Sequence, residues 1–278
     1  MNSCQKYFSV CLLALLSQAA FAQSGPTPGP ASSFAVLSAA PNGGGAVTCT
    51  DSSIIGDVGS SGQPASVVQT RCTISGAIVA PVSAGVLADF NGAYDALKAV
   101  PCGQTLTGTL AGVTLSPGVY CFDAAATLTG TLTLNGGSSD TWLFKIGTLA
   151  PGALTGTNFS VVMNGGGQAC NVTWWVDAAA TMTTSNFLGT IYAGAAITDT
   201  GGTFNGNALA KAAVTLTGAS LAGCESGGGG KTHQKCNQGV GNGPEGCDPG
   251  NSNQGNPFRS NDELGGTPGD PGRQGGNK

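Results

Sequence analysis

The segment Thr127-Leu-Thr-Gly-Thr-Leu-Thr-Leu134 contains the pattern that decides the fold of this chain. Leucine and threonine alternate along it with a period of two, which is typical of a β-strand. The leucines therefore lie on one side of the strand, and Thr127, Thr129, Thr131 and Thr133 lie on the other. One side builds a core, and the other presents a ladder of threonine.

Related segments recur on both sides of this stretch, at Thr105–Leu110, Leu154–Thr157 and Thr215–Gly218. Short apolar runs separate them: Thr141–Ile146, Phe159–Met163, Val172–Val176 and Gly189–Tyr192. Many short strands between glycine-rich turns are typical of an all-β fold. Leu106, Leu128 and Leu154 are separated by 22 and then 26 residues, which is in the range of solenoid repeats. We therefore expect irregular stacked coils, whose end strands need a cap.

Residues 82–99 form the one segment with clear helical periodicity. Its apolar positions follow a single stripe: Val86, Phe90, Ala93, Tyr94 and Leu97. Ser83 is placed to cap the start of the helix. A single amphipathic helix in a β-rich chain is expected to lie along the outside of the sheets, with Asp89, Asp95 and Lys98 facing solvent.

The composition excludes some classes of function. Of 278 residues only 9% are charged, 47 are glycine, and the net charge is -4. With ten Lys and Arg residues the chain has too few cations to neutralise many phosphates, so we expect no nucleic-acid partner.

Residues 1–22 are typical of a secretory signal peptide, with Lys6 ahead of the apolar run Phe8–Leu16 and a cleavage site at Ala20-Phe-Ala22. No later run reaches the about 18 apolar residues of a membrane span. We therefore expect a secreted protein that is extracellular or associated with the cell surface.

Three zones follow the predicted signal peptide. Residues 23–30 form a Pro/Gly linker, and residues 31–224 hold nearly all the large apolar side chains and form the predicted folded domain. Residues 225–278 contain 16 glycines and five prolines, a composition that predicts a disordered tail.

Eight cysteines lie outside the predicted signal peptide, and an even number in an exported chain favours disulfides. Eight cysteines can pair in about a hundred ways, and spacing alone does not choose among them. The pairing that we prefer joins neighbours in the sequence: Cys49 with Cys72, Cys102 with Cys121, Cys170 with Cys224, and Cys236 with Cys247. The chain has no Cys-x-x-Cys motif, so we expect no metal site. We expect no cofactor either.

Eight segments, in this order and spacing, resemble the secreted ice-binding-like (DUF3494) proteins of cold-adapted microbes. They cover most of residues 31–224: Ser33–Leu37, Ile55–Gly59, Pro117–Cys121, Thr127–Leu134, Trp142–Ile146, Ala169–Val176, Gly189–Tyr192 and Asn205–Leu216. The resemblance implies an irregular right-handed β-solenoid (β-helix) of triangular section, with one long α-helix packed along a face.

Known members of this family bind ice through a flat face, and some carry there the motif Thr, Ala or Gly, any residue, then Thr or Asn. This chain has two full matches, Thr155–Asn158 and Thr200–Thr203, and a near match at Thr217–Ser220. Thr107–Leu110 and Thr129–Leu132 end in leucine instead, so the array is expected to be partial. The resemblance implies ice contacts at Thr155, Thr157, Asn158, Thr200, Thr203, Thr215, Thr217 and Ser220.

A catalytic site is not expected. The single histidine, His233, lies in the predicted tail, and residues 23–224 contain no glutamate. Two pairs of carboxylates are the remaining candidates for acid and base, and each lies near glycine or serine as turn residues do: Asp51 with Asp57, and Asp123 with Asp140.

Other conspicuous residues have ordinary structural interpretations. Lys145 and Lys211 are isolated cations that we expect in solvent. Trp174 and Trp175 point to opposite sides of one strand, so at least one belongs in the core. The Asn- and Gly-rich loop Cys236–Cys247 does not have the spacing of an EF-hand, which favours a flexible tether over a calcium site.

The sequence thus predicts a monomeric, non-enzymatic, secreted ice-binding protein whose partner is the surface of an ice crystal. Its effect would be to inhibit ice growth or recrystallisation. A cell-surface or matrix adhesion module with the same fold is the main alternative, because threonine also suits exposed strand positions without any ligand. A polysaccharide hydrolase or lyase is a third.

Overall fold

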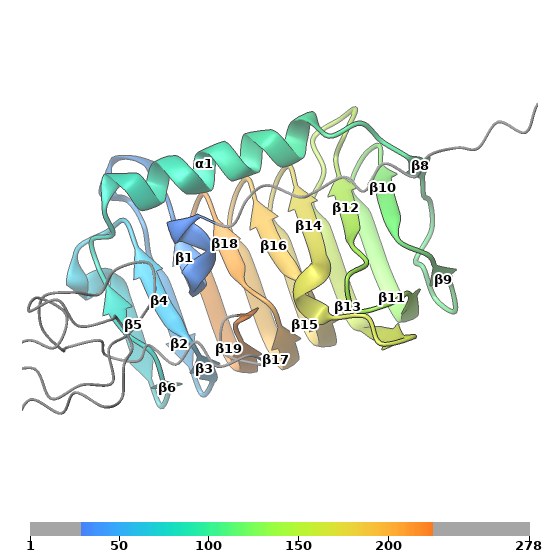
Figure 1. Ribbon diagram of the computed structural model, residues 1–278. Coiled ribbons are helices and arrows are strands. Elements are labelled where there is room, and N and C mark those ends of the chain that lie inside the picture. The colour runs from blue at the N-terminus through green and yellow to red at the C-terminus, as the bar shows by residue number, and fades with distance from the viewer. Residues whose placement is uncertain (1–28, 225–278) are drawn as a thin grey trace, which may run out of the picture.

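The computed structural model describes residues 29–224, which form a mainly β structure with two parallel sheets and one α-helix (Figure 1). The predicted signal peptide, most of the predicted linker and the segment 225–278 lie outside the described residues. The predicted Cys236–Cys247 pair and His233 belong to that segment and are outside as well.

Sheet A has nine strands, and every pairing in it is parallel. In spatial order they are β7 (Ile78–Val79), β4 (Asp57–Ser60), β1 (Phe34–Ser38), β18 (Ala208–Ala210), β16 (Thr190–Ala193), β14 (Val172–Val176), β12 (Trp142–Ile146), β10 (Gly118–Phe122) and β8 (Gln104–Thr105).

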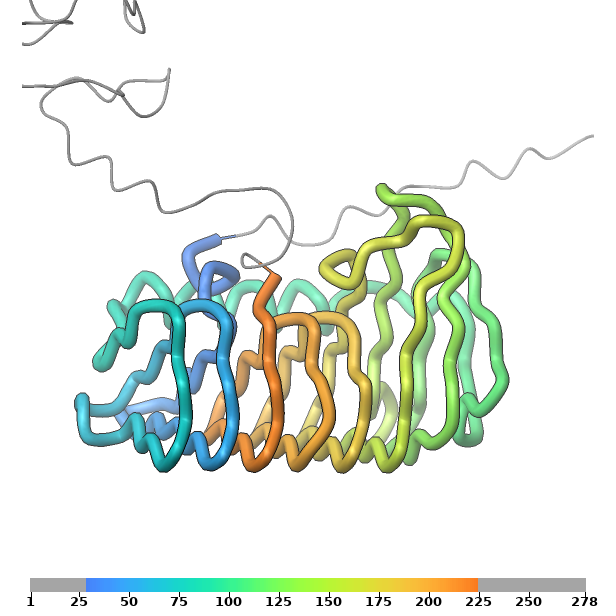
Figure 2. Tube along the Cα trace, turned by 90° about the horizontal axis from the view of Figure 1, so that it is seen from below, coloured from blue at the N-terminus to red at the C-terminus, as the bar shows by residue number. Residues whose placement is uncertain are grey.

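Sheet B is also parallel. Its main path is β5 (Val67–Thr70), β2 (Val47–Thr50), β19 (Val214–Ala222), β17 (Ile197–Asn205), β15 (Ala180–Leu188), β13 (Leu154–Asn164), β11 (Ala126–Asn135) and β9 (Thr114–Leu115). Off this path, β3 (Ser53–Ile55) pairs with β19, and β6 (Thr73–Ile74) pairs with β3. From β10 to β19 the chain alternates between the sheets, so each turn adds one strand to both. Figure 2 shows these turns side by side.

The predicted strand Thr105–Leu110 is the exception among the repeats. Only Gln104–Thr105 pairs with β10, and Leu110 has a positive φ of 60° and is 3% exposed. Beyond Thr105 the segment leaves sheet A, buries Leu110 in the core and runs beside β11, where Thr109 O accepts from Thr129 N at 3.2 Å. Short 3-10 helices complete the structure at Pro30–Ser33, Pro41–Gly43, Pro64–Ser66 and Ala169–Asn171.

The two ends of the described chain meet inside the stack. Strand β1 pairs with β18 on one side and with β4 on the other, so the first turns are added beyond the last one. The helix α1 (Ala84–Ala99) then carries the chain from β7, at one end of sheet A, back to β8 at the other (Figure 1). Its 16 residues span about 24 Å, most of the distance across the strands.

The predicted apolar stripe of α1 packs on the outer side of sheet A. Phe90 and Tyr94 contact Tyr192 and Trp175, with ring centroids 5.9 and 5.4 Å apart. Ser83 caps the helix, accepting a hydrogen bond from Val86 N. Asp95 and Lys98 are exposed, as expected. Asp89 is not fully solvated, since its Oδ2 accepts a hydrogen bond from Ala31 N at 2.9 Å and holds the N-terminal segment on the helix.

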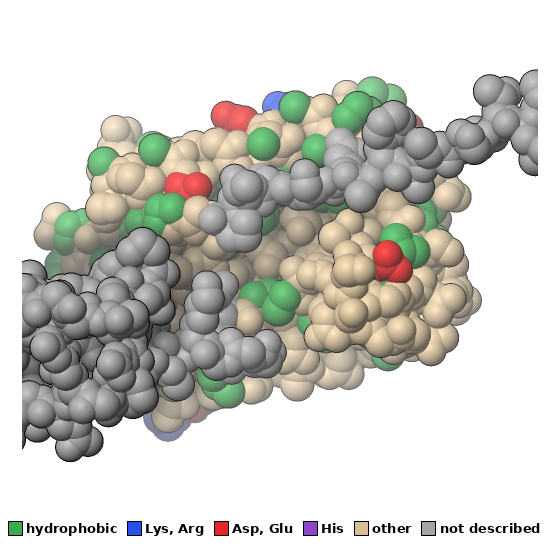
Figure 3. Space-filling model, in the orientation of Figure 1, with side chains coloured by type: hydrophobic (Ala, Val, Ile, Leu, Met, Phe, Trp, Pro, Cys, Tyr) green, Lys and Arg blue, Asp and Glu red, His purple; other side chains and the backbone are tan. Residues whose placement is uncertain are grey.

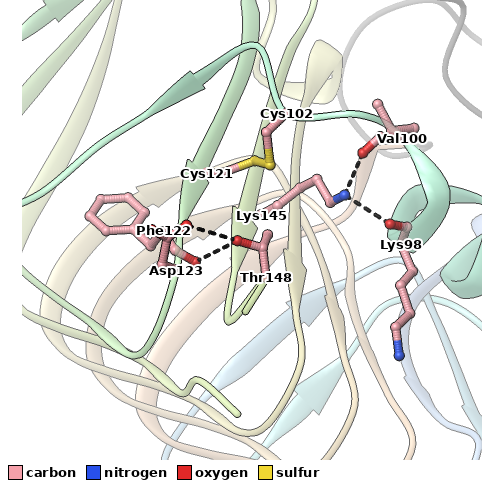
Figure 4. Close-up of a disulfide and its surroundings, with 8 residues drawn as sticks. All are labelled: Lys98, Val100, Cys102, Cys121, Phe122, Asp123, Lys145 and Thr148. Carbon is pink, nitrogen blue, oxygen red and sulfur yellow. Dashed lines mark hydrogen bonds between the residues drawn. A yellow bond between two sulfur atoms is a disulfide. The ribbon is translucent and has the colours of Figure 1, made fainter. Parts of the chain in front are cut away.

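The expectation that Lys145 lies in solvent is wrong. It is 5% exposed, and its Nζ donates to the carbonyl oxygens of Lys98 and Val100 at 2.8 and 2.5 Å (Figure 4). The end of a helix leaves carbonyls without partners, so an ammonium group is well placed there. Lys211 is partly covered as well: its Nζ lies 3.7 Å from the centre of the Tyr94 ring.

The main core lies between the two sheets, and Leu128, Leu132 and Leu134 are all buried in it, as their alternation predicts. Trp174 and Trp175 do point to opposite sides of β14. Trp174 stacks on Phe144 in the main core, and Trp175 packs under α1. Sheet A is therefore covered on both sides, whereas the outer side of sheet B carries no helix among the described elements.

Disulfides tie the turns together as the neighbour pairing predicts: Cys49–Cys72, Cys102–Cys121 and Cys170–Cys224 are bonded. Cys49–Cys72 fastens the last turn at the β5 end, and Cys102–Cys121 (Figure 4) fastens the segment before β8 to β10 at the other. Crosslinks at both ends hold the strands that have a neighbour on one side only.

Candidate functional site

Two straight columns of threonine run across the outer side of sheet B. Residues paired strand by strand form the first: Thr127, Thr155, Thr181, Thr198, Thr215, Thr48 and Val68. The second lies two residues further along the same strands: Thr129, Thr157, Thr183, Thr200, Thr217, Thr50 and Thr70. We call these two columns the Thr face. Val68 is its only position that is not threonine, and no position is charged.

The residue between the two threonines points inward in every strand. This interior row is apolar or small except at two positions: Leu128, Gly156, Met182, Asp199, Leu216, Cys49 and Gln69. Gln69 is exposed in the terminal strand, and the other six are buried. The pattern Thr-x-Thr therefore puts two side chains per strand on one surface, about 6.7 Å apart along the strand and about 4.8 Å apart across strands.

A residue in the left-handed conformation ends the Thr face in each of these strands. It directly follows the second threonine, with φ between 48° and 71°: Gly130, Asn158, Thr184, Gly201, Gly218, Asp51 and Arg71. Three of them, Thr184, Asp51 and Arg71, are neither glycine nor asparagine, although positive φ is uncommon for such residues. A left-handed residue at the same place in every turn forms a corner, and the chain beyond it runs onto a second surface.

This second surface, which we call the mixed face, begins with the outward residues Thr131, Ser160, Asn186, Thr203, Ser220, Ser53 and Thr73. Several of these side chains bond to one another: Thr203 Oγ1 donates to Asn186 Oδ1 at 3.0 Å, and Ser53 and Ser220 share a hydrogen bond of 3.0 Å. Further along, Val162 and Ile55 are 42% and 47% exposed. Within residues 29–224, no Thr-face hydroxyl bonds to another side chain, so these groups differ from their neighbours across the corner.

Charged groups lie at the border of the Thr face and not on it. The guanidinium of Arg71 donates to the carboxylate of Asp51, with Nη2 2.7 Å from Oδ2, at the corner of the last two turns. This hydrogen bonding lowers the pKa of Asp51. On the side of the molecule that Figure 3 shows, acidic and basic side chains are also few, and Lys211 Nζ lies 4.0 Å from Asp95 Oδ1 on α1.

Asp199 lies beneath the Thr face, between Thr198 and Thr200. It is 3% exposed, and its Oδ2 has no hydrogen-bond partner. Burial away from water disfavours the charged carboxylate and raises the pKa of Asp199 to about 7.

The structure divides the residues of the predicted site between two surfaces. Thr155, Thr157, Thr200, Thr215 and Thr217 lie on the Thr face. Asn158 is a corner residue, and Thr203 and Ser220 lie on the mixed face. The four-residue motif therefore spans the corner. The alternation within Thr127–Leu134 spans it too, because Gly130 sends Thr131 and Thr133 onto the mixed face.

Eight threonines of the Thr face are absent from the predicted site: Thr48, Thr50, Thr70, Thr127, Thr129, Thr181, Thr183 and Thr198. The tripeptide Thr-x-Thr finds seven of them, and Thr70 escapes it because position 68 is valine. The tripeptide recurs at Thr48, Thr181 and Thr198 as well as in the segments with the longer motif.

The carboxylates considered for catalysis have structural partners. Asp57 Oδ1 accepts from Ala77 N at 2.7 Å, and Asp140 Oδ2 accepts from Gly137 N at 2.8 Å. Asp123 accepts from the hydroxyl of Thr148 (Figure 4). In the described part of the chain no three His, Cys, Asp or Glu side chains are grouped to hold a metal ion. No helix between residues 29 and 224 is long and apolar enough to cross a membrane.

Comparison with known proteins adds independent information. The family model described as ice-binding-like matches residues 42–222. An ice-binding protein of Nostoc sp. (strain HG1) is 35% identical over 176 residues, and one of Flavobacterium frigoris (strain PS1) is 30% identical over 181. Each match covers 59% of this chain, and 61% and 63% of the respective relative.

The crystal structure of an ice-binding protein from the Antarctic ascomycete Antarctomyces psychrotrophicus superposes with a TM-score of 0.63 at 31% identity. The superposition covers 72% of this chain and 97% of that one.

Proposed function

Because this chain belongs to the ice-binding-like family, we propose that it binds ice through the Thr face and thereby inhibits ice growth or recrystallisation. The observation that carries the proposal is the pair of in-register threonine columns on one uncharged surface. The names of the relatives from Nostoc and Flavobacterium agree with it.

The chemistry follows from the regularity of the columns. Threonine is β-branched and stiff at χ1, so a stack of outward threonines holds methyl and hydroxyl groups at nearly fixed positions. Water anchored by the hydroxyls above the methyl groups is then ordered before ice arrives, and it loses little further entropy when it joins the crystal. A charged side chain on the surface would order water around itself, so the absence of charge from the fourteen positions matters.

We propose a right-handed β-solenoid as the scaffold. Parallel crossover connections are right-handed in nearly all proteins, and the alternation between sheets A and B supplies one such connection after another. The cross-section of the solenoid would then have three sides: the Thr face, the mixed face beyond the corner, and the side that carries α1. This scaffold keeps the spacing between threonine pairs constant over seven strands.

Among the residues that the family resemblance implies, we propose ice contacts at Thr155, Thr157, Thr200, Thr215 and Thr217, together with the other threonines of the Thr face. Asn158 would border the contact. Thr203 and Ser220 would lie outside it, because their strands have turned the corner before they are reached.

The proposal extends to a non-enzymatic, monomeric protein that works outside the cell. The main alternative, an adhesion module, requires no lattice of identical side chains, and the discriminating feature is whether the threonines share one surface. The alignment of thirteen of them favours ice over adhesion.

The test is thermal hysteresis with observation of crystal shape, using the full exported chain and the double variant Thr155→Tyr/Thr200→Tyr. The matched control, Ser160→Tyr/Thr203→Tyr, places the same bulk on the same two strands beyond the corner. We expect the first variant to lose most of the activity and the control to keep it, with the same circular dichroism in both. Round ice crystals and no hysteresis with the wild-type chain would reject the proposal and leave the adhesion module.

A further inference from the structure

Asp199 is the one acidic residue in the interior row beneath the Thr face. The neighbouring positions of that row are Met182 on β15 and Leu216 on β19, and both are at most 1% exposed. Buried carboxyls are normally paired or hydrogen-bonded, yet Oδ2 of Asp199 has no partner. A buried carboxyl without a partner lowers the stability of the fold, so Asp199 is unusual at this position.

No charge faces Asp199 from the elements packed around it. Strands β16 and β18 contribute Ile191, Ala193, Ala208 and Ala210 to the same core. Tyr120 is the other titratable side chain in that core, and it lies near the far end of the stack, with its hydroxyl bonded to Ser116 O. Lys145, the other buried charged residue of the described chain, lies on the helix side of sheet A.

We propose that Asp199 is a positioning residue for the Thr face, which keeps its order while the carboxyl is neutral and loses it around Thr198 and Thr200 when the carboxyl ionises. The effect is local, because Asp199 is joined by peptide bonds to both threonines and lies under the middle of the columns. An ionised carboxylate without a partner must draw water into the core or move toward the surface. Either change shifts β17 relative to β15 and β19.

The direction of the pH effect follows from linkage. Below pH about 4 the carboxyl is protonated in both the folded and the unfolded chain, so its burial has no electrostatic cost. Between the ordinary pKa of 3.8 and the folded value of about 7, the unfolded chain releases the proton and the folded chain keeps it. The folding equilibrium constant therefore falls about tenfold per pH unit, by about a thousandfold in all.

The experiment measures urea unfolding and thermal hysteresis of the full chain, with disulfides intact, at about pH 5 and about pH 8. The variant Asp199→Asn keeps the shape of the side chain without the titration. Asp199→Leu matches Leu128 and Leu216 in the same interior row and serves if the asparagine variant does not fold. Asp123→Asn, at an exposed carboxyl, is the matched control.

We expect the urea midpoint of the wild type to fall on going to the higher pH by clearly more than that of Asp199→Asn, and the Asp123→Asn midpoint to follow the wild type. Hysteresis should fall with pH in the wild type and not in Asp199→Asn. Parallel unfolding profiles in the wild type and Asp199→Asn would overturn the inference.

The role in positioning, as distinct from stability, rests on the proposed function. A stability difference without any pH effect on hysteresis would overturn that role while leaving ice binding intact. A wild type without hysteresis at either pH would reject ice binding and the positioning role together, and the unfolding profiles would still report on the burial of Asp199.

Discussion

The Thr face and the mixed face are built from the same turns of chain, and yet their side chains differ sharply. The Thr face repeats one residue type at thirteen of its fourteen positions. A few residues later in the same strands, the mixed face carries Ser160, Asn186, Thr203 and the exposed Val162. Because the backbone continues around the corner, and the register shifts there only between β11 and β13, the fold itself does not require threonine.

The difference between the two faces is not explained by the β-propensity of threonine alone. Threonine has high β-propensity, and a strand exposed to solvent accepts it readily. The mixed face is also open to solvent and has the same parallel pairing, and there serine, asparagine and valine are accepted too. Its polar side chains bond among themselves, whereas the Thr-face hydroxyls bond to no other side chain in residues 29–224. The uniform columns therefore support the proposal that the Thr face contacts ice.

The largest effect is expected from one charge placed on either side of the corner of β15. Thr183→Lys puts an ammonium group in the middle of the Thr face, where it reorganises the water around it, and we expect most of the hysteresis to disappear. Asn186→Lys puts the same group on the mixed face and should leave hysteresis near the wild-type value. Equal losses in the two variants would show that both faces touch ice.

A smaller effect is expected when the disulfide that holds the turn at the β5 end of the stack is removed. Replacing Cys49 and Cys72 by alanine opens a crosslink with a sequence separation of 23 residues, which typically costs about 3 kcal/mol of unfolding free energy. Cys49 lies in the interior row beneath the Thr face, so fraying of β5 should shorten both columns and reduce hysteresis in part. The pair Cys102→Ala/Cys121→Ala is the comparison, because it loosens β8, and the turn that contains β8 contributes no strand to the Thr face. Urea unfolding and hysteresis on both variants separate lost stability from lost surface.

The corner itself is tested at Gly218, where φ is 62° and an added Cβ meets no atom within 4 Å. Gly218→Val forces a β-branched residue into the left-handed region and should cost about 1–2 kcal/mol of stability. Gly218→Asn should cost less, since Asn158 adopts this conformation in a nearby turn. Chemical denaturation compares the two, and equal costs would mean that the left-handed corner does not set the limit between the faces.

The smallest effect is expected from completing the first column. Val68→Thr replaces the one position of the Thr face that lacks a hydroxyl, and its side chain is 47% exposed. Stability should change by less than about 0.5 kcal/mol, and hysteresis should rise slightly as the ordered surface gains one site. Val162→Thr makes the same substitution on the mixed face and should leave hysteresis unchanged. A gain at Val162 equal to the gain at Val68 would remove the distinction between the two faces.

Local patterns predicted much of the architecture correctly. The alternation around Leu128 and Leu132 identifies a strand and its buried side, and the stripe of Val86, Phe90 and Leu97 identifies the helix and the side that packs. Cysteines that neighbour one another in the sequence are paired, because successive turns of a stack are also neighbours in space.

Two polar contacts between distant segments were not predicted. Lys145 looks like an isolated cation until α1 is seen to end beside it, and its partners are the carbonyls of Lys98 and Val100. Asp89 likewise reaches Ala31, 58 residues away in the sequence. In both cases the partner is a backbone group, which leaves no mark in a sequence pattern.

What the sequence by itself determined is the period of each strand, the single helix, the family and the abundance of threonine without charge. Only the tertiary structure decided which threonines share a surface. Thr48 and Thr50 stand beside Thr215 and Thr217 because the first turns of the chain are stacked beyond the last. The corner after each Thr-x-Thr then separates Thr200 from Thr203. Periodicity is a local property of a strand, whereas a surface is made by the register between strands far apart in the chain, and that register is set by the packing of the whole core.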